Sequence, residues 1–254
     1  RLRNHRTLSL SAAALVGLFA AASPARAANQ TWDDANASNS WNVATLNWDA
    51  GLAAWTNGNN AIFGGAGEAV DTDAALTAVN LTFNSNGYSI VDTGTAGTLT
   101  LVGAPSLLSV TNSSDTATIS EILAGSGGIS KTGNGTLRLN GVNTYTGLTT
   151  VTAGELDLNA PGVALQGSLT VNAANANGLI NNVKLLQPEQ IADGSTVTLT
   201  SGILELGANN ETVNSLVLNG GILSGTTGVL TASTATGSPP SPPVPVLTFS
   251  FIRQ

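Results

Sequence analysis

Two stretches of this chain repeat themselves at a spacing of 19 residues. Gly135–Asn140 recurs as Gly154–Asn159, and Val197–Leu204 recurs as Leu216–Leu223. In both stretches apolar and polar residues alternate between turns rich in Gly, Asn and Thr, which is typical of half-buried β-strands. A strand–turn unit that recurs at a fixed period buries its apolar edge against the next copy. The spacing therefore predicts an all-β fold, a right-handed parallel β-helix (solenoid) with coils of about 19 residues.

The sequence around the first repeat resembles a known family. The segments GISKTGNGTL at Gly128–Leu137, NTYTG at Asn143–Gly147 and VTAGEL at Val151–Leu156 closely resemble the autotransporter-associated β-strand repeat. Further along, Gln190–Asp193 and Asn210–Val213 are similar to the segment that follows this repeat in the family. The resemblance implies a passenger-type β-helix of bacterial surface and secreted proteins, in which the repeat supports folding and export.

The alternation within the repeat predicts the direction of its side chains. Leu137 and Leu139 are expected to touch Leu156 and Leu158 inside the stack, because alternate residues of a strand face the same side. The charged residues of the repeat are expected to point outward: Lys131, Arg138, Glu155 and Asp157.

Five regions are expected along the chain. They are a signal peptide at 1–27, an N-terminal Trp-rich capping β-segment at 28–96, the β-helix at 97–230 with the repeat at 127–159, a Ser/Thr/Pro-rich linker at 231–245, and an unassigned tail at 246–254. Within the β-helix, Asn181–Ile191 interrupts the strand pattern and is predicted to be a loop. The tail is too short for the eight or more strands of a translocator barrel, so we expect an outer-membrane translocator or anchor to be absent from this chain.

The leader predicts export. Arg1, Arg3 and Arg6 precede an apolar run at Leu8–Ala22, and Ala25–Ala27 supplies an A-x-A cleavage site. The apolar run is too short and too rich in Ala for a membrane span. We therefore expect a cleavable signal peptide and a location outside the cell or at the bacterial cell surface.

The charge balance excludes a basic nucleic-acid-binding surface. Four of the eight Lys and Arg residues lie in the leader, so its removal changes the formal net charge from −7 to −11. Nucleic-acid-binding proteins need a cationic surface to neutralise phosphates. The chain has no Cys, so disulfides, thiolate metal sites and Cys nucleophiles are excluded as well.

All four tryptophans lie in one segment, Trp32–Trp55, and two interpretations are open. The indoles could close the exposed end of the stack, since solenoids need atypical terminal repeats. They could instead form a platform that stacks sugars. Nearby, Asp71 and Asp73 could be a calcium pair, but Ca²⁺ takes six to eight oxygen ligands and no dense acidic loop is present, which favours a solvated surface.

No catalytic, cofactor-binding or metal-binding residue is predicted. The single histidine, His5, lies in the leader, so the exported chain has no imidazole base. We expect a non-enzymatic surface or secreted module, structural or adhesive, whose partners are cell-surface or extracellular glycans or proteins. Parallel β-helices also host polysaccharide lyases and hydrolases, and the acids open to such an enzyme are Glu155 with Asp157, or Glu205 alone. An inert spacer that carries a further domain is the other alternative.

Overall fold

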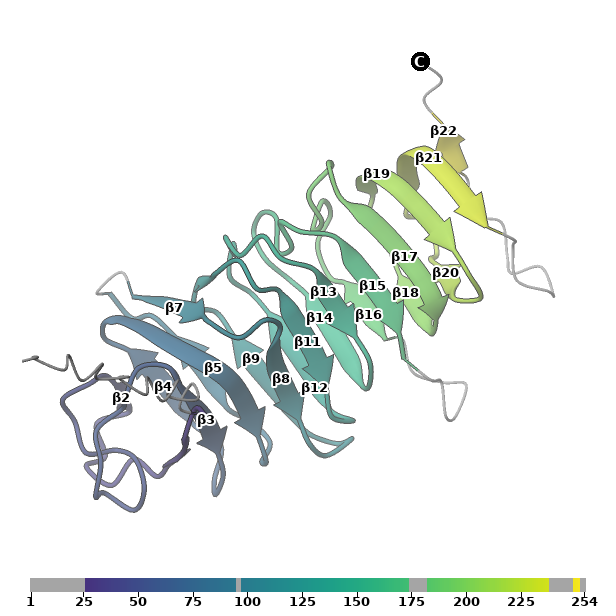
Figure 1. Ribbon diagram of the computed structural model, residues 1–254. Helices are drawn as coiled ribbons and strands as arrows, with labels where there is room; N and C mark the ends of the chain where they lie inside the picture. Colours follow the sequence, from purple (N-terminus) through teal and green to yellow (C-terminus); the bar gives the residue numbers. More distant parts are fainter. Residues whose placement is uncertain (1–25, 95–96, 174–181, 238–248, 252–254) are drawn as a thin grey trace, which may run out of the picture.

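The protein is an elongated stack of parallel β-strands (Figure 1). The computed structural model describes residues 26–94, 97–173, 182–237 and 249–251, and within these ranges it contains no helix. Most coils of the chain add one strand to a thirteen-stranded sheet and one to a nine-stranded sheet. Strands that are neighbours in either sheet run parallel. The expected parallel β-solenoid is therefore confirmed.

The strands divide between the two sheets as follows. The thirteen-stranded sheet contains β1 (Asn29–Trp32), β3 (Asn59–Phe63), β5 (Ala75–Phe83), β7 (Thr98–Leu101), β8 (Ser106–Val110), β10 (Leu123–Ala124), β11 (Ile129–Thr132), β13 (Thr149–Val151), β15 (Leu169–Asn172), β17 (Thr196–Ser201), β19 (Glu211–Leu218), β21 (Leu230–Gly237) and β22 (Phe249–Phe251). The nine-stranded sheet contains β2 (Ser40–Trp41), β4 (Ala69–Thr72), β6 (Ser89–Val91), β9 (Thr116–Ile119), β12 (Thr136–Leu139), β14 (Glu155–Leu158), β16 (Val183–Leu185), β18 (Ile203–Glu205) and β20 (Ile222–Ser224).

The 19-residue spacing sets the register of neighbouring strands. Leu137 and Leu139 of β12 lie directly opposite Leu156 and Leu158 of β14, and all four side chains are buried. The second repeat pairs in the same way, with the Val197–Leu199 strand opposite Leu216–Leu218. Both pairs of repeats therefore form adjoining coils, as predicted, and their apolar residues build continuous rows through the core.

The tryptophans close the N-terminal end of this core. Their indoles are only 0–2% exposed and contact one another, with ring centroids 4.6 Å apart for Trp48 and Trp55 and 5.3 Å apart for Trp41 and Trp48. Phe63 continues the cluster, stacking on Phe83 of the next coil at 4.9 Å. Because the ring faces are covered by other rings, the structure supports the cap and leaves no indole face for stacking a sugar.

Two predicted irregular segments differ from expectation. Asn181–Ile191 was predicted to be a loop, but Val183–Leu185 form β16, which pairs with β14 and β18. The linker predicted at 231–245 begins with seven residues that continue β21 against β19. In both segments a parallel neighbour on each coil supplies the backbone partners that decide strand formation, whereas the local composition is that of a loop. Residues 238–245 lie outside the described part of the chain.

Candidate functional site

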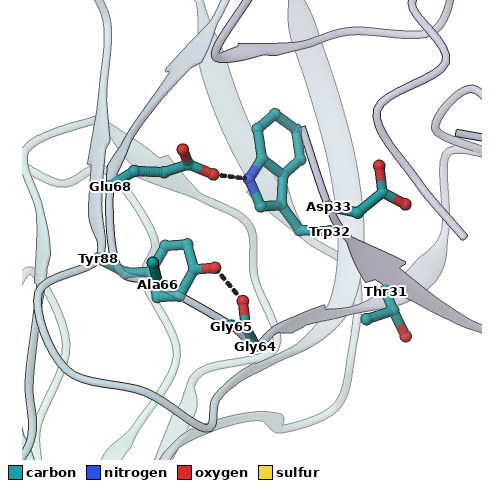
Figure 2. Close-up of a pocket in the computed structure, with 8 residues that line it drawn as sticks. All are labelled: Thr31, Trp32, Asp33, Gly64, Gly65, Ala66, Glu68 and Tyr88. Carbon is teal, nitrogen blue, oxygen red and sulfur yellow. Dashed lines mark hydrogen bonds between the residues drawn. The ribbon is translucent and has the colours of Figure 1, made fainter. Parts of the chain in front are cut away.

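A pocket of about 400 Å³ opens on the side of the N-terminal coils (Figure 2). Three segments form it: the end of β1, the turn between β3 and β4, and the residue before β6. Its lining residues are Thr31, Trp32, Asp33, Gly64, Gly65, Ala66, Glu68 and Tyr88. The turn is rich in Gly and Ala, so it adds little side-chain volume and leaves the space open.

Two hydrogen bonds fix the polar groups of this pocket. The indole Nε1 of Trp32 donates to Glu68 Oε1 at 2.5 Å, and the hydroxyl of Tyr88 donates to the carbonyl oxygen of Gly64 (Figure 2). Burial, followed by the charge of Glu68, raises the pKa of Tyr88 to about 12. Tyr88 is therefore a neutral hydroxyl at physiological pH, and the Glu68 carboxylate has one oxygen held by an aromatic donor.

The pocket lies in a half of the molecule that has no cationic side chain. Asp33 lines the pocket with Glu68, and its two oxygens accept backbone N–H groups of Ala35 and Gly51. Between residues 27 and 130 the sequence contains no Lys, Arg or His. The same interval contains nine acids: Asp33, Asp34, Asp49, Glu68, Asp71, Asp73, Asp92, Asp115 and Glu121. The potential around the pocket is therefore negative.

Lys131 was predicted to point outward, and this prediction is wrong. Its side chain is fully buried in the inward row of β11, opposite Leu108 of β8 and Val151 of β13. The ammonium Nζ donates to three backbone carbonyl oxygens, those of Thr132 at 2.9 Å, Gly133 at 3.0 Å and Ala153 at 3.1 Å. Burial lowers the pKa of Lys131 to about 8, and the negative charge of Glu155 opposes this shift.

The ammonium of Lys131 sits beside a glycine that the turn requires. Gly154 has a φ of 66°, and a Cβ at this position would lie 2.4 Å from the carbonyl oxygen of Gly135 and 2.8 Å from Lys131 Nζ. Such a φ is accessible to Gly at little cost, and the missing side chain leaves room for the ammonium. Lys131 therefore joins two successive turns of the repeat from inside the stack.

Charged residues of alternating sign form a row on the outer face of the nine-stranded sheet. Arg138, Asp157, Lys184 and Glu205 lie at directly paired positions on β12, β14, β16 and β18. Arg138 Nη2 contacts Asp157 Oδ2 at 2.8 Å, with the arginine side chain 40% exposed and the aspartate 3% exposed. Arg138 and Asp157 thus lie on the expected outer side, but neighbouring side chains cover Asp157.

Glu155 lies two residues before Asp157 on the same face. Burial, then the hydrogen bond and the charge of Asp157, raise the pKa of Glu155 to about 7. The buried Oδ1 of Asp157 receives no hydrogen bond from an N–H or hydroxyl of the described residues, and a protonated Glu155 carboxyl can supply one. Two neighbouring carboxyls could in principle serve acid–base catalysis, but Asp157 is only 2% exposed, so a polysaccharide cannot reach its oxygens.

The remaining candidate acids have protein partners. Asp71 accepts hydrogen bonds from the backbone N–H and the hydroxyl of Thr93, and Asp73 accepts one from the hydroxyl of Ser40. Glu205 Oε2 accepts a hydrogen bond from Ser224 at 2.6 Å. Within the described ranges, no three His, Cys, Asp or Glu residues lie close enough together to hold a metal ion.

Glu68 and the buried Glu211 are the groups that the sequence did not reveal. Glu211 is completely buried, and its oxygens accept the N–H groups of Gln190 at 2.8 Å and Ile191 at 3.2 Å. Burial raises the pKa of Glu211 to about 8, although these hydrogen bonds act in the opposite direction. For Glu68, the one available signal is an acid directly after the Gly-rich run at Gly64–Gly67.

Comparisons with known proteins relate the chain to a transport repeat and to an adhesin. Residues 129–158 match the Passenger-associated-transport-repeat family. Over 217 residues the chain is 33% identical to the Adhesin BmaC autotransporter of Brucella suis biovar 1 (strain 1330). That match covers 80% of this chain, and the chain spans only about 6% of the length of that relative. No solved structure gives a significant match.

The described residues contain no helix with the length and apolarity needed to cross a membrane. The transport repeat coincides with β11 to β14, where Lys131 and the paired leucines join successive coils. The relative matches across most of the solenoid, including the coils on both sides of that repeat. The repeat, the relative and the parallel solenoid together support an autotransporter passenger repeat protein.

Proposed function

We propose that this solenoid is a non-enzymatic adhesive module of an exported passenger protein. The observation that carries the proposal is the 33% identity to an autotransporter adhesin across 80% of the chain. Because the chain corresponds to about 6% of that adhesin, the comparison bears on one segment of a much longer protein. Binding to glycans or proteins outside the cell is accordingly proposed for this segment alone.

The outer surface of the thirteen-stranded sheet is suited to binding another molecule rather than to catalysis. Ser130, Thr150, Thr170 and Thr198 occupy directly paired positions on β11, β13, β15 and β17. A row of hydroxyls offers donors and acceptors at the spacing of the strands, about 4.8 Å, to any polar surface laid against it. The acids open to a hydrolase or lyase are Glu155 with Asp157, or Glu205 alone. The burial of Asp157 and the hydrogen bond from Ser224 to Glu205 argue against that alternative.

The leader at 1–27 lies mostly outside the described residues, and we propose that it is a cleavable signal peptide. We likewise propose the secreted or cell-surface location, with the segment 28–96 acting as a cap and 97–230 as the β-helix proper. The amino terminus of the exported protein tests the first point. A terminus at Ala28 is expected, and an exported protein that retains Ala25–Ala27 would contradict it.

An adhesion assay tests the proposed function. Beads coated with the full chain should bind cultured epithelial layers or extracellular matrix in a saturable manner, and free chain should compete. Beads coated with the Leu137→Asp variant, in which the stack is disrupted, serve as the matched control. Equal binding of both bead types would contradict a specific adhesive role. Release of sugars from a polysaccharide panel that is lost in Glu155→Gln would support the enzyme alternative instead.

A further inference from the structure

We propose that the pocket beside Trp32 and Glu68 binds a primary alkylammonium group, the side chain of a lysine presented by a basic partner protein. The inference rests on the proposed adhesive function and names the chemistry of its partner. It is drawn from the shape of the pocket, the fixed carboxylate in its wall and the absence of cationic side chains between residues 27 and 130.

Glu68 presents one oxygen that no protein group occupies. Its Oε1 accepts the indole N–H of Trp32, whereas Oε2 accepts no hydrogen bond from the described residues. The Trp32 hydrogen bond holds the carboxylate in one orientation before any ligand arrives. A pre-oriented carboxylate loses little conformational freedom when a cation binds, so more of the contact energy appears as affinity.

The charge of the pocket selects against anions. Asp33 and Glu68 both line it, and the described residues contain one ion pair within 4 Å, Arg138 with Asp157 on distant coils. The 104 residues from 27 to 130 have no cationic side chain that could neutralise these acids. A positively charged ligand in the pocket would therefore neutralise acidic side chains that no cationic side chain of this interval neutralises.

The size and ligand set of the pocket favour an organic cation over a metal ion. Ca²⁺ takes six to eight oxygen ligands, and the described residues contain no group of three acids suited to a metal. An ammonium has three donors and is satisfied by one carboxylate oxygen and a few neutral acceptors. A pocket of about 400 Å³ also has room for the four-carbon stem of lysine beside Trp32 and Tyr88.

The two aromatic side chains shape the wall rather than offer a broad ring face. Trp32 and Tyr88 are each 2% exposed, so neither offers an open ring face to a ligand. This geometry suits a slender aliphatic stem and does not suit the flat face of a sugar ring, which needs an exposed aromatic face for stacking. A lysine side chain is therefore a better match than an amino sugar with the same ammonium group.

Titration of the full chain with Nα-acetyl-lysine N-methylamide tests the proposal. The probe should shift the resonances of the Trp32 indole N–H and of the Gly64 and Gly65 amides in a saturable manner at millimolar concentration, and added salt should weaken the effect. The norleucine analogue has the same stem without the ammonium and should give no saturable shift. Glucosamine should bind more weakly than the lysine probe.

Two variants make the test specific. Glu68→Gln keeps an oxygen that can accept the Trp32 hydrogen bond but removes the charge, and it should weaken binding at least about tenfold, because charge-assisted hydrogen bonds are the stronger kind. Glu205→Gln removes an acid from the far end of the stack and should leave binding unchanged. Equal shifts with the norleucine probe, or an undiminished affinity in Glu68→Gln, would overturn the proposal. Tighter binding of glucosamine would overturn the assignment to lysine.

The bead assay separates this proposal from the adhesive function on which it rests. If Glu68→Gln beads adhere as well as unmodified beads, adhesion stands and the pocket is not its site. If the lysine probe binds while unmodified beads fail to adhere, the pocket stands and the adhesive function fails.

Discussion

The ammonium of Lys131 donates a hydrogen bond to the carbonyl oxygen of Ala153, which belongs to the next coil of the solenoid. The same ammonium also holds the carbonyls of Thr132 and Gly133 in its own coil. A buried cation thus satisfies three backbone acceptors at a place where the chain turns between its two sheets. Because each coil of the stack contacts only its neighbours, these hydrogen bonds directly stabilise the interface between the coil of Lys131 and the next coil.

Replacement of Lys131 by Met should therefore destabilise the protein. Met fills a similar volume and removes a buried charge, but three carbonyl oxygens lose their donor, and each unsatisfied buried acceptor costs about 1–3 kcal/mol. Because removal of the charge offsets part of this loss, we expect a net cost of about 2 kcal/mol in the free energy of unfolding at pH 7. Urea denaturation measures it.

The matched control for this variant is Lys184→Met, which removes a partly exposed lysine of the outer charged row. Lys184 forms no ion pair within 4 Å among the described residues, so the effect of its loss should stay below about 0.5 kcal/mol. A Lys131→Met protein that is as stable as the control would show that the three carbonyls do not depend on the ammonium.

Arg138 lies on the outer face, yet its replacement should lower the stability of the protein. The buried carboxylate of Asp157 would lose its guanidinium partner, and Lys184 of the next strand could replace only part of it. We expect Arg138→Gln to cost about 1–3 kcal/mol, and the double variant Arg138→Gln with Asp157→Asn to recover part of that loss. Thermal or urea denaturation of the unmodified chain, the two single variants and the double variant gives the coupling energy. Strict additivity would mean that the ion pair contributes nothing to stability.

The buried Glu211 predicts a stability that falls as the pH rises. Its pKa is raised from 4.5 to about 8 in the folded protein, so between these values the folded state binds more protons than the unfolded state. The resulting stabilisation is complete below pH 4.5 and is lost as the pH rises through about 8. Glu155, with a pKa near 7, acts in the same direction over the lower part of this range.

Unfolding free energies measured from pH 5 to pH 8 should therefore decrease by about 2–4 kcal/mol in the unmodified chain. Glu211→Gln cannot titrate and should flatten most of this slope, even if it lowers stability at pH 5. Asp193→Asn, which changes an exposed acid, should keep the slope. A slope that survives in Glu211→Gln would contradict the assignment.

A substitution in the N-terminal cap and a substitution in the middle of the stack should destabilise different sets of strands. Trp41→Ala removes a fully buried indole from the N-terminal aromatic cluster and should cost about 3–5 kcal/mol. Because coils interact with their neighbours, hydrogen exchange should increase in β1 to β5 and remain slow in β15 to β19. Leu137→Asp buries an unpaired carboxylate in the centre and should increase exchange on both sides of the repeat. Identical exchange maps for the two variants would rule out nearest-neighbour behaviour.

The sequence was most informative where apolar residues recur. The pairs Leu137 with Leu156 and Leu139 with Leu158 followed directly from the spacing of 19, and the structure places each pair side by side. Repetition fixes register because a shift by one residue would turn every apolar side chain toward solvent. The location of the pocket could not be obtained in this way, because it is formed by turns from three coils with no shared period.

Lys131 shows how residue chemistry can mislead. Strict alternation places it on the same side as Ile129, which is the inward side, and the burial of β11 follows that alternation. The prediction instead grouped Lys131 with the outward charged residues of the repeat, although a lysine can be buried where its ammonium has partners. The hydrogen-bond partners of Lys131 are backbone carbonyls of two turns, and a pattern of side chains cannot predict them.

The uneven placement of charge along the rod has a mechanical consequence. The interval from 27 to 130 carries nine acids and no cation, whereas residues 131–237 carry three cations against six acids. Beside an anionic lipid or polysaccharide layer, repulsion acts mainly on the first of these intervals and exerts a torque on the molecule. With a screening length of about 8 Å in physiological salt, the torque operates only when the rod lies nearly against the layer. Close to such a layer, the tryptophan-capped part of the stack, with the pocket beside it, is therefore the part that is repelled most strongly.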